Sequence, residues 1–222
     1  METQHFHTKR GCLSYITYDT RSGEAMLIDP STEMGAVAYL DFLQVNHLTL
    51  KYIVETHTHA DHVSLAHELK EVTGARIVRH KNAPSPRRDI SVGGGEELFL
   101  GEAEVHILGT PGHTNESISL YNGKEVFTGD ALLIGGTGRT DFQIGESAAL
   151  YQSLHQMLAT LPKETVVRPG HDYQGRNQAL LGDELHTNPR LLLSESEFVS
   201  LMDGYHPAKP ELFDQAIQEN SR

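Results

Sequence analysis

The chain is poor in the residues that build disulfides and thiolate metal clusters. Its 222 residues include one cysteine, Cys12, and no tryptophan. A single thiol cannot form a disulfide within the chain and cannot supply a cysteine zinc cluster. Because Cys12 lies in an apparent strand, we expect a structural thiol rather than a nucleophile.

Long apolar runs and positive charge are also scarce. No stretch of about 18 apolar residues occurs, so no membrane-spanning segment is predicted. The N-terminus lacks the apolar core of a secretory signal and the composition of a transit peptide. With 18 Lys and Arg against 30 Asp and Glu, the formal net charge is −12, which argues against nucleic acid as the main partner. We expect a cytoplasmic, globular protein with no membrane or nucleic-acid partner.

The sequence is rich in histidine, with 14 residues, and several of them form a motif. His57, His59, Asp61 and His62 make the pattern H-x-H-x-D-H directly after the apolar run of a predicted strand, 50–55. Histidine is the commonest metal ligand, and aspartate adds a hard anionic oxygen. In α/β folds ligands tend to bind where strands end. This pattern predicts one corner of a metal site, rather than a polar loop in a His-rich chain.

Three further residues of metal-ligating type follow predicted strands in Gly-containing turns. His113 follows Pro111-Gly112, Asp130 follows Gly129, and His171 follows Gly170. Small residues before a ligand let the backbone approach an ion, and loops on a rigid scaffold are where sites are built. Each turn alone is an ordinary surface turn, whereas the three together with H-x-H-x-D-H predict a shared site.

The order of the predicted elements is mixed. We expect one domain, 1–222, with a polar helical tail from about residue 177. Strands outnumber helices in the first half, which suggests sheets packed face to face with helices outside. The predicted helices are 33–46, 60–72 and 147–160, and the predicted strands are 13–18, 24–28, 50–55, 76–79, 90–92, 97–100, 104–108, 118–121, 125–128 and 165–168.

Taken together, the four motifs resemble the motif series of the metallo-β-lactamase superfamily, over nearly the whole chain. The resemblance implies an α/β (α+β) fold, the αββα sandwich, with two mixed sheets, helices on the outer faces and metal along one edge. For members that hold two metals it implies two ligand groups and a bridging residue: His57, His59 and His113 for one metal, Asp61, His62 and His171 for the other, and Asp130 between them.

The segments between the motifs resemble the persulfide dioxygenase (sulfur dioxygenase, ethylmalonic encephalopathy protein-like) branch of this superfamily. That branch implies a mononuclear non-haem iron enzyme that oxidises glutathione persulfide with O₂ to sulfite and glutathione. Carried onto this chain, its one Fe(II) per chain is held by His57, His113 and Asp130. The segments that carry the resemblance are 25–30, 129–134, 138–143, 170–173, 188–191, 197–199 and 209–210.

The implied triad agrees with general metal chemistry. Two histidines and one carboxylate on one face of Fe(II) leave three positions open, as in non-haem iron oxygenases. A persulfide and O₂ can then occupy neighbouring positions. The remaining ligand types would orient the triad by hydrogen bonding or form a second metal site; they are His59, Asp61, His62 and His171.

Three residues are candidates for contact with the substrate. Arg139 comes first because a guanidinium binds carboxylates with two parallel hydrogen bonds, and a structural salt bridge is the alternative role for it. Tyr173 and Arg190 are weaker candidates. The expected partners are glutathione persulfide and O₂, and a homodimer is the assembly left open.

The main alternative is a binuclear zinc hydrolase of the glyoxalase II type. All the ligand types for two Zn are present, and a metal-activated hydroxide would attack a glutathione thioester. The short tail favours the dioxygenase instead. A third class, a protein that binds metal without turnover, is disfavoured by the intact ligand set.

The chain departs from the dioxygenase pattern near the ligands. Asn115 and Glu116 stand where Pro-Gly is usual, Leu65 where Gly is usual, and Thr137 where many relatives have Cys. We expect these changes to affect the substrate more than the metal, with Glu116 adding negative charge near an anionic substrate.

Overall fold

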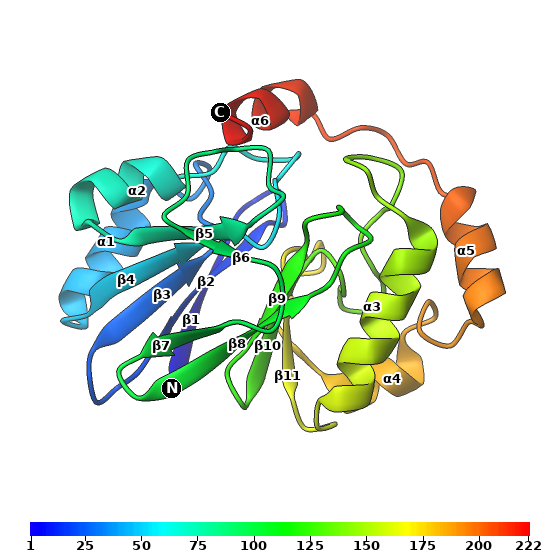
Figure 1. Cartoon of the computed structure of the whole chain (residues 1–222), viewed down its shortest axis with the longest axis horizontal. Helices are drawn as coiled ribbons and strands as arrows, with labels where there is room; N and C mark the ends of the chain where they lie inside the picture. The colour runs from blue at the N-terminus through cyan, green and yellow to red at the C-terminus, as the bar shows by residue number, and fades with distance from the viewer.

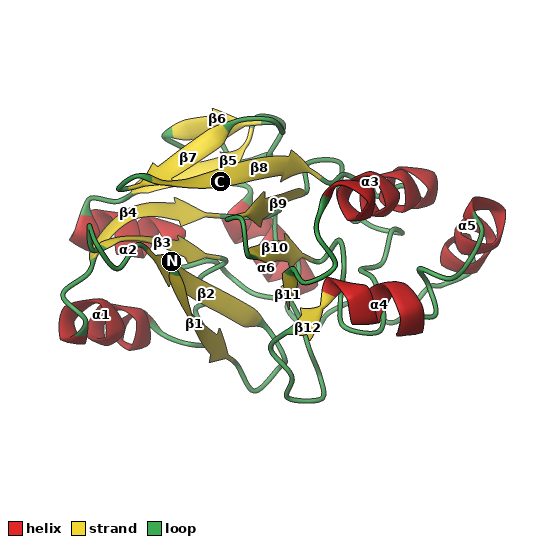
Figure 2. Cartoon of the chain, turned by 90° about the horizontal axis from the view of Figure 1, so that it is seen from below, coloured by secondary structure: helices red, strands yellow, loops and turns green.

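Two six-stranded sheets pack face to face in the computed structural model, which describes residues 1–222 apart from the side chain of Leu158 (Figures 1 and 2). The first sheet has the spatial order β1-β2-β3-β4-β5-β6. Its strands are β1 (Glu2–His7), β2 (Leu13–Tyr18), β3 (Glu24–Ile28), β4 (Thr49–Val54), β5 (Arg76–His80) and β6 (Ile90–Val92).

In the first sheet, β3 to β6 run parallel and β1 to β3 antiparallel. In β3 every residue after Glu24 is buried. A near-continuous apolar run of this kind is expected for a strand with covered faces on both sides. The apolar ends of β3 and β4 therefore lie in the interior, where they support the loops that follow them.

The second sheet has the order β12-β11-β10-β9-β8-β7. Only the pair of β10 and β11 is parallel among its strand pairs in the described residues. Its strands are β7 (Glu97–Leu100), β8 (Ala103–Gly109), β9 (Ile118–Tyr121), β10 (Glu125–Gly129), β11 (Val166–Pro169) and β12 (Ala179–Leu180).

Helices cover the outer faces of both sheets, so the predicted αββα arrangement is confirmed (Figure 2). One apolar cluster fills the space between the sheets, and two more lie between a sheet and its helices. In the described residues no helix has the length and apolar character needed to cross a bilayer. The helices are α1 (Ala36–Val45), α2 (Ala66–Thr73), α3 (Ser147–Thr160), α4 (Leu181–Thr187), α5 (Glu195–Asp203) and α6 (Phe213–Asn220).

The helix predicted for 60–72 begins six residues late, at Ala66. The preceding backbone has other partners: Thr32 N–H donates to the Val63 carbonyl, and Leu65 N–H donates to the Pro30 carbonyl. Ser64 Oγ then accepts from Ala66 N–H at 3.0 Å, which satisfies one free donor of the first turn. The histidine motif thus stays outside the helix.

Other boundaries also differ from the prediction. The helix predicted for 33–46 is α1, which starts at Ala36 after a Gly35 with φ of 79°. Strand β1 was not predicted, because it has one apolar residue, Phe6, among polar residues and histidines and so lacks an apolar run. The tail predicted to be helical from about 177 starts with the short strand β12, which pairs with β11, and then forms α4, α5 and α6.

The candidate ligands lie in loops at one edge of the two sheets. His57 follows β4, His113 lies between β8 and β9, Asp130 follows β10, and His171 follows β11. The first loop comes from one sheet and the other three from the second. The site is therefore built across the sandwich, as the strand-end positions of the motifs predicted.

Candidate metal centre

Two histidines and one aspartate converge from three different loops. The ligating atoms of His57, His113 and Asp130 all lie within 4.8 Å of one another. Nε2 of His113 is 3.7 Å from Oδ2 of Asp130, and the two imidazole rings are 4.9 Å apart at 86°. We call these three residues the ligand face.

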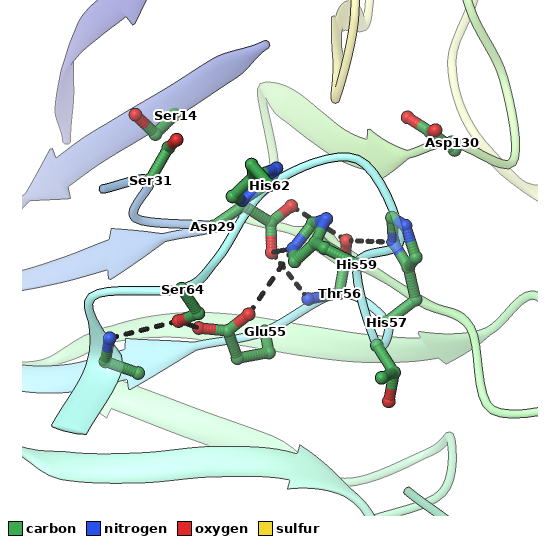
Figure 3. Close-up of polar contacts among 12 residues, drawn as sticks. Ser14, Asp29, Ser31, Glu55, Thr56, His57, His59, His62, Ser64 and Asp130 are labelled. Atoms are coloured by element: carbon green, nitrogen blue, oxygen red, sulfur yellow. Dashed lines mark hydrogen bonds and ion pairs between the residues drawn. The ribbon is translucent and has the colours of Figure 1, made fainter. Parts of the chain in front are cut away.

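Hydrogen bonds determine which nitrogen of His57 is free. The Thr56 hydroxyl donates to Asp29 Oδ2 at 2.7 Å and lies 2.9 Å from Nδ1 of His57 (Figure 3). Because its one proton is used on the carboxylate, the hydroxyl accepts from Nδ1–H. Nε2 of His57 therefore keeps the lone pair that a metal requires. Burial lowers the pKa of His57 well below its usual value, which keeps the ring neutral.

His113 has the same tautomer for a different reason. Its Nδ1 lies 2.7 Å from the backbone carbonyl oxygen of Arg139. A carbonyl can only accept, so Nδ1 carries the proton and Nε2 is free. The preceding Gly112 has φ of 139°, and a Cβ there would collide with the backbone of Leu150. Glycine at this position lets the loop pass close to α3 and turn His113 inward.

Asp130 is held by a chain of charged groups. His171 has Nδ1 at 2.6 Å from Asp130 Oδ1 and Nε2 at 2.9 Å from Asp61 Oδ2. Burial opposes a charged ring, but the two carboxylates raise the pKa of His171 well above its usual value. Burial likewise opposes ionisation of Asp130, yet His171 lowers the pKa of this carboxyl. One oxygen of Asp130 is engaged by His171, and Oδ2 remains for an ion.

Asp61 joins three groups at one oxygen. Besides His171, its Oδ2 contacts the Cys12 thiol at 3.1 Å and Nδ1 of His62 at 2.9 Å. Cys12 is buried. It lies between β1 and β2, however, where it forms an isolated bridge to His171. The four side chains make a continuous polar network beside the ligand face.

His59 is only two residues from His57, but its side chain lies against two carboxylates. Its Nε2 is 3.1 Å from Asp29 Oδ1 and 3.4 Å from Glu55 Oε2, and all three residues are buried (Figure 3). Burial disfavours a charged ring, but Asp29 and Glu55 raise the pKa of His59 well above its usual value. We call His59, Asp29 and Glu55 the carboxylate brace.

The ligand face fits a metal ion by the chemistry of its donors. It offers the Nε2 atoms of two imidazoles and one carboxylate oxygen, the donor set of the two-histidine, one-carboxylate iron sites. Each donor is oriented by a second hydrogen bond, as is usual for metal ligands. Of the other residues of ligand type, Asp61 contacts His62 and His171, and His59 lies beside Asp29 and Glu55. Nε2 of His62 and both ring nitrogens of His59 are buried without a hydrogen-bond partner.

A cavity of about 380 Å³ opens onto the ligand face. Its volume is within the range of small-molecule pockets. Loops from both sheets and the segment before α6 line it. The lining residues include Arg10, Cys12, Asp61, His113, Asp130, Leu133, Arg139, Phe142, His171, Tyr173 and Glu211.

Arg139 lies at this cavity, but the chain itself uses most of its donors. Nε and Nη2 bind Asp141 at 2.6 and 2.7 Å, and the carbonyls of Pro207 and Ala208 accept from Nη2 and Nη1. The guanidinium carbon also lies 4.0 Å from the centre of the Phe142 ring. Arg139 thus attaches the C-terminal segment to the cavity wall.

Tyr173 and Arg190 occupy different environments. Tyr173 is 78% exposed at the cavity and stacks on His171 with 6.1 Å between ring centres. Arg190 donates to the carbonyl and hydroxyl oxygens of Thr137 at 2.8 and 2.9 Å and lies over Tyr205. Arg190 therefore supports the cavity wall at Thr137, whereas Tyr173 faces the opening.

Glu116 is placed differently from our expectation. It is buried, and its Oε1 accepts from the Thr58 backbone N–H at 2.7 Å and from the Thr114 hydroxyl at 3.2 Å. It connects the loops of His57 and His113 and does not line the cavity in the described residues.

Asn220 supports the motif loop, a role that is not predicted from the sequence. Its Nδ2 donates to the carbonyls of His59 and His62 at 2.9 and 2.8 Å, and its Oδ1 accepts from Ser64 N–H at 2.9 Å. An asparagine near the end of a polar helix carries no sequence signal for such a role. It satisfies the backbone of the motif loop, which neither a helix nor a strand does.

With this geometry in place, the class of protein is clear. The family model described as the metallo-beta-lactamase superfamily matches residues 8–171. The chain therefore belongs to the metallo-beta-lactamase superfamily, which confirms the family that the motifs predicted.

Within the superfamily, the predicted resemblance to the persulfide dioxygenase branch is also confirmed. Mouse (Mus musculus) mitochondrial persulfide dioxygenase ETHE1 is 36% identical over 223 residues, which cover 99% of this chain and 87% of the relative. The crystal structure of ETHE1 from Myxococcus xanthus superposes with a TM-score of 0.95 at 38% identity, covering 100% and 98% of the two chains. The hydroxyacylglutathione hydrolase of Pelagibacter ubique is 35% identical over 181 residues, 80% of this chain and 73% of the relative.

Proposed function

We propose that this protein is a persulfide dioxygenase that oxidises glutathione persulfide with O₂ to sulfite and glutathione, at one Fe(II) held by His57, His113 and Asp130. The observation that carries the proposal is the pairing of the other ligand types. His59 lies 3.1 Å from Asp29, and His171 lies between two carboxylates. Because both nitrogens of His171 are used on Asp130 and Asp61, His171 offers no free nitrogen to a second metal, which favours one metal per chain. The similarity to the mouse persulfide dioxygenase favours the reaction class.

A bound Fe(II) would supply the electron transfer that lets O₂ react with a persulfide sulfur. The chain's own residues hold the donors in place. The Thr56 hydroxyl keeps a proton at Nδ1 of His57, and the Arg139 carbonyl keeps one at Nδ1 of His113. His171 keeps a proton between itself and Asp130. Each of these contacts fixes a tautomer or a charge before substrate arrives.

The cavity also suits a small thiol-containing substrate. Its walls combine polar groups near the ligand face with apolar side chains such as Leu133 and Phe142. Apolar walls exclude water from the reacting sulfur, which protects a reactive persulfide from side reactions.

Metal analysis tests the number and identity of the ion. Protein purified without added metal should contain about one iron per chain, because the ligand face offers one set of three donors. Two zinc ions per chain with little iron would instead support the glyoxalase II alternative and contradict the dioxygenase.

An oxygen electrode tests the reaction. O₂ uptake should depend on glutathione persulfide, and sulfite and glutathione should appear in equal amounts. Hydrolysis of lactoylglutathione without O₂ uptake would support the thioester hydrolase, the activity named for the Pelagibacter ubique relative.

Two expectations from the sequence stay predictions. A homodimer can be tested by light scattering of the purified protein. The cytoplasmic location can be tested by fractionation of the source cell, and a mitochondrial location, as in the name of the mouse relative, would contradict it.

A further inference from the structure

Two arginines lie at the cavity among the described residues, and they differ in how many of their donors are free. An arginine has five N–H donors. Arg139 uses four of them on Asp141, Pro207 and Ala208. One remaining donor cannot form the paired hydrogen bonds by which a guanidinium recognises a carboxylate. Arg139 is therefore poorly suited to bind a substrate carboxylate.

Arg10 has the opposite character. Its side chain is 47% exposed, and in the described part of the chain its one ion-pair partner is Glu211, at 3.1 Å. It belongs to the turn between β1 and β2, and Cys12 of the same turn also lines the cavity. The turn thus runs from the cavity mouth to its polar floor.

Glu211 is a weakly held partner. Its side chain is 79% exposed, and Arg10 is its one ion-pair partner among the described residues. An exposed pair of this kind contributes about 0–1 kcal/mol, because water solvates both charges. A second carboxylate could therefore replace Glu211 on Arg10 at little cost.

The charge of the cavity creates a need for such a cation. The chain has a formal net charge of −12, and Asp61, Asp130 and Glu211 all line the cavity. Glutathione persulfide carries two carboxylates, which a free cation would attract. Arg139 and His171 also line the cavity, but they are already paired with Asp141 and with Asp61 and Asp130. Arg10 is the guanidinium that can supply the attraction.

We propose that Arg10 is a specificity-determining residue that binds a carboxylate of the thiol substrate, and that Glu211 occupies the same guanidinium until the substrate displaces it. This inference rests on the proposed function, because it takes glutathione persulfide as the substrate. No bond is made or broken in the exchange, in which one carboxylate replaces another on Arg10.

Steady-state O₂ uptake by the iron-loaded protein tests the proposal. Arg10→Ala should raise KM for glutathione persulfide by up to about fivefold with kcat nearly unchanged, because it removes an exposed ion pair that is made in both ground and transition states. The KM of Arg10→Lys should lie between those of the wild type and Arg10→Ala, because lysine keeps the positive charge but lacks the paired N–H donors of a guanidinium. An alkyl persulfide without carboxylates should show the same KM in all three proteins.

Glu211→Gln supplies a change in the other direction. Removal of the competing carboxylate should lower KM for glutathione persulfide by up to about fivefold. Arg21→Ala is the matched control, because Arg21 forms a similarly exposed pair with Glu102 at 3.5 Å away from this cavity and should leave KM unchanged.

Calorimetric titration with glutathione separates this proposal from the proposed function. Weaker binding of glutathione to Arg10→Ala than to the wild type supports the role of Arg10. If no persulfide supports O₂ uptake, the dioxygenase assignment is removed, but the role of Arg10 in binding glutathione still stands. An unchanged Kd and KM in Arg10→Ala, or an equal rise in KM for the alkyl persulfide, would overturn the role of Arg10.

Discussion

The ligand face and the carboxylate brace contain histidines from one motif, two residues apart, with opposite surroundings. His57 gives Nδ1 to the Thr56 hydroxyl and keeps Nε2 free. His59 is buried against two carboxylates, which raise its pKa against the effect of burial, whereas burial lowers the pKa of His57. Nε2 of one ring is free to bind a metal, whereas the other ring lies against the carboxylates of Asp29 and Glu55, which favour its charged form.

The difference teaches that residue type and spacing define a motif, whereas the partner of each ring defines its task. Asp29 connects the two regions: Oδ2 accepts from Thr56, and Oδ1 faces His59. The carboxylate brace therefore holds Asp29 in position, and Asp29 in turn sets the tautomer of His57 through the Thr56 hydroxyl. The following variants test this division of roles, from the largest expected effect to the smallest.

Asp130→Ala should cause the largest loss. It removes the one carboxylate of the ligand face and leaves the charged His171 without its partner at 2.6 Å. Loss of a hydrogen-bond partner of a ligand typically costs about 10–100-fold in metal affinity or activity. Because Asp130 is itself a ligand, iron content and persulfide-dependent O₂ uptake should fall by more than this. Metal analysis and an oxygen electrode measure both. Asp183→Ala on the exposed face of α4 is the control, and wild-type iron content in Asp130→Ala would contradict the ligand face.

His59→Phe should mainly reduce stability. It leaves Asp29 and Glu55 buried without their cation, and breaking a buried pair in this way costs about 3–5 kcal/mol. Urea unfolding of the metal-free protein measures this loss. His57→Ala should unfold close to the wild type in the same assay, yet bind no iron. If His59→Phe kept wild-type stability and lost only its metal, the brace would have to be reassigned as part of the ligand set.

Sequence reasoning found the elements of the site because ligand types at strand ends follow local rules. H-x-H-x-D-H after β4 and the Gly-containing turns before His113, Asp130 and His171 all lie at the same edge of the sandwich. The structure gives a reason for two of these turns: a Cβ at Gly112 would collide with the backbone of Leu150, and a Cβ at Gly170 would lie 2.6 Å from Asp130 Oδ1.

The partners of the side chains could not be found in this way, because they come from distant parts of the chain. Asn220 binds the loop of His59 across 161 residues, and Arg139 is bound by carbonyls 68 and 69 residues later. No local pattern records such a contact. Arg139 was therefore predicted to bind a substrate carboxylate, although in the structure its N–H donors hold the C-terminal segment in place.

Thr56→Val separates orientation from stability. Valine has a similar shape but cannot transmit the charge of Asp29 to Nδ1 of His57, so the imidazole loses its preferred tautomer. Iron affinity should fall about 10–100-fold, while the free energy of unfolding should change by about 1–3 kcal/mol. Chelator competition measures the affinity. Thr49→Val, at an exposed position of the preceding strand β4, is the control, and an unchanged affinity in Thr56→Val would remove the hydroxyl from the account of His57.

Glu116→Gln should have the smallest effect, because Glu116 links the loops of the ligand face without lining the cavity. Burial raises the pKa of Glu116, and the hydrogen bond from Thr58 only partly offsets this. A carboxyl whose folded pKa exceeds its unfolded pKa contributes most stability below the unfolded value and loses it as pH rises through the folded value. As the pH rises from about 5 to about 8, the free energy of unfolding of Glu116→Gln should therefore rise by up to about 1 kcal/mol relative to that of the wild type. Urea unfolding at both pH values measures the gain. A KM for glutathione persulfide that falls in this variant would instead place the charge of Glu116 within reach of the substrate.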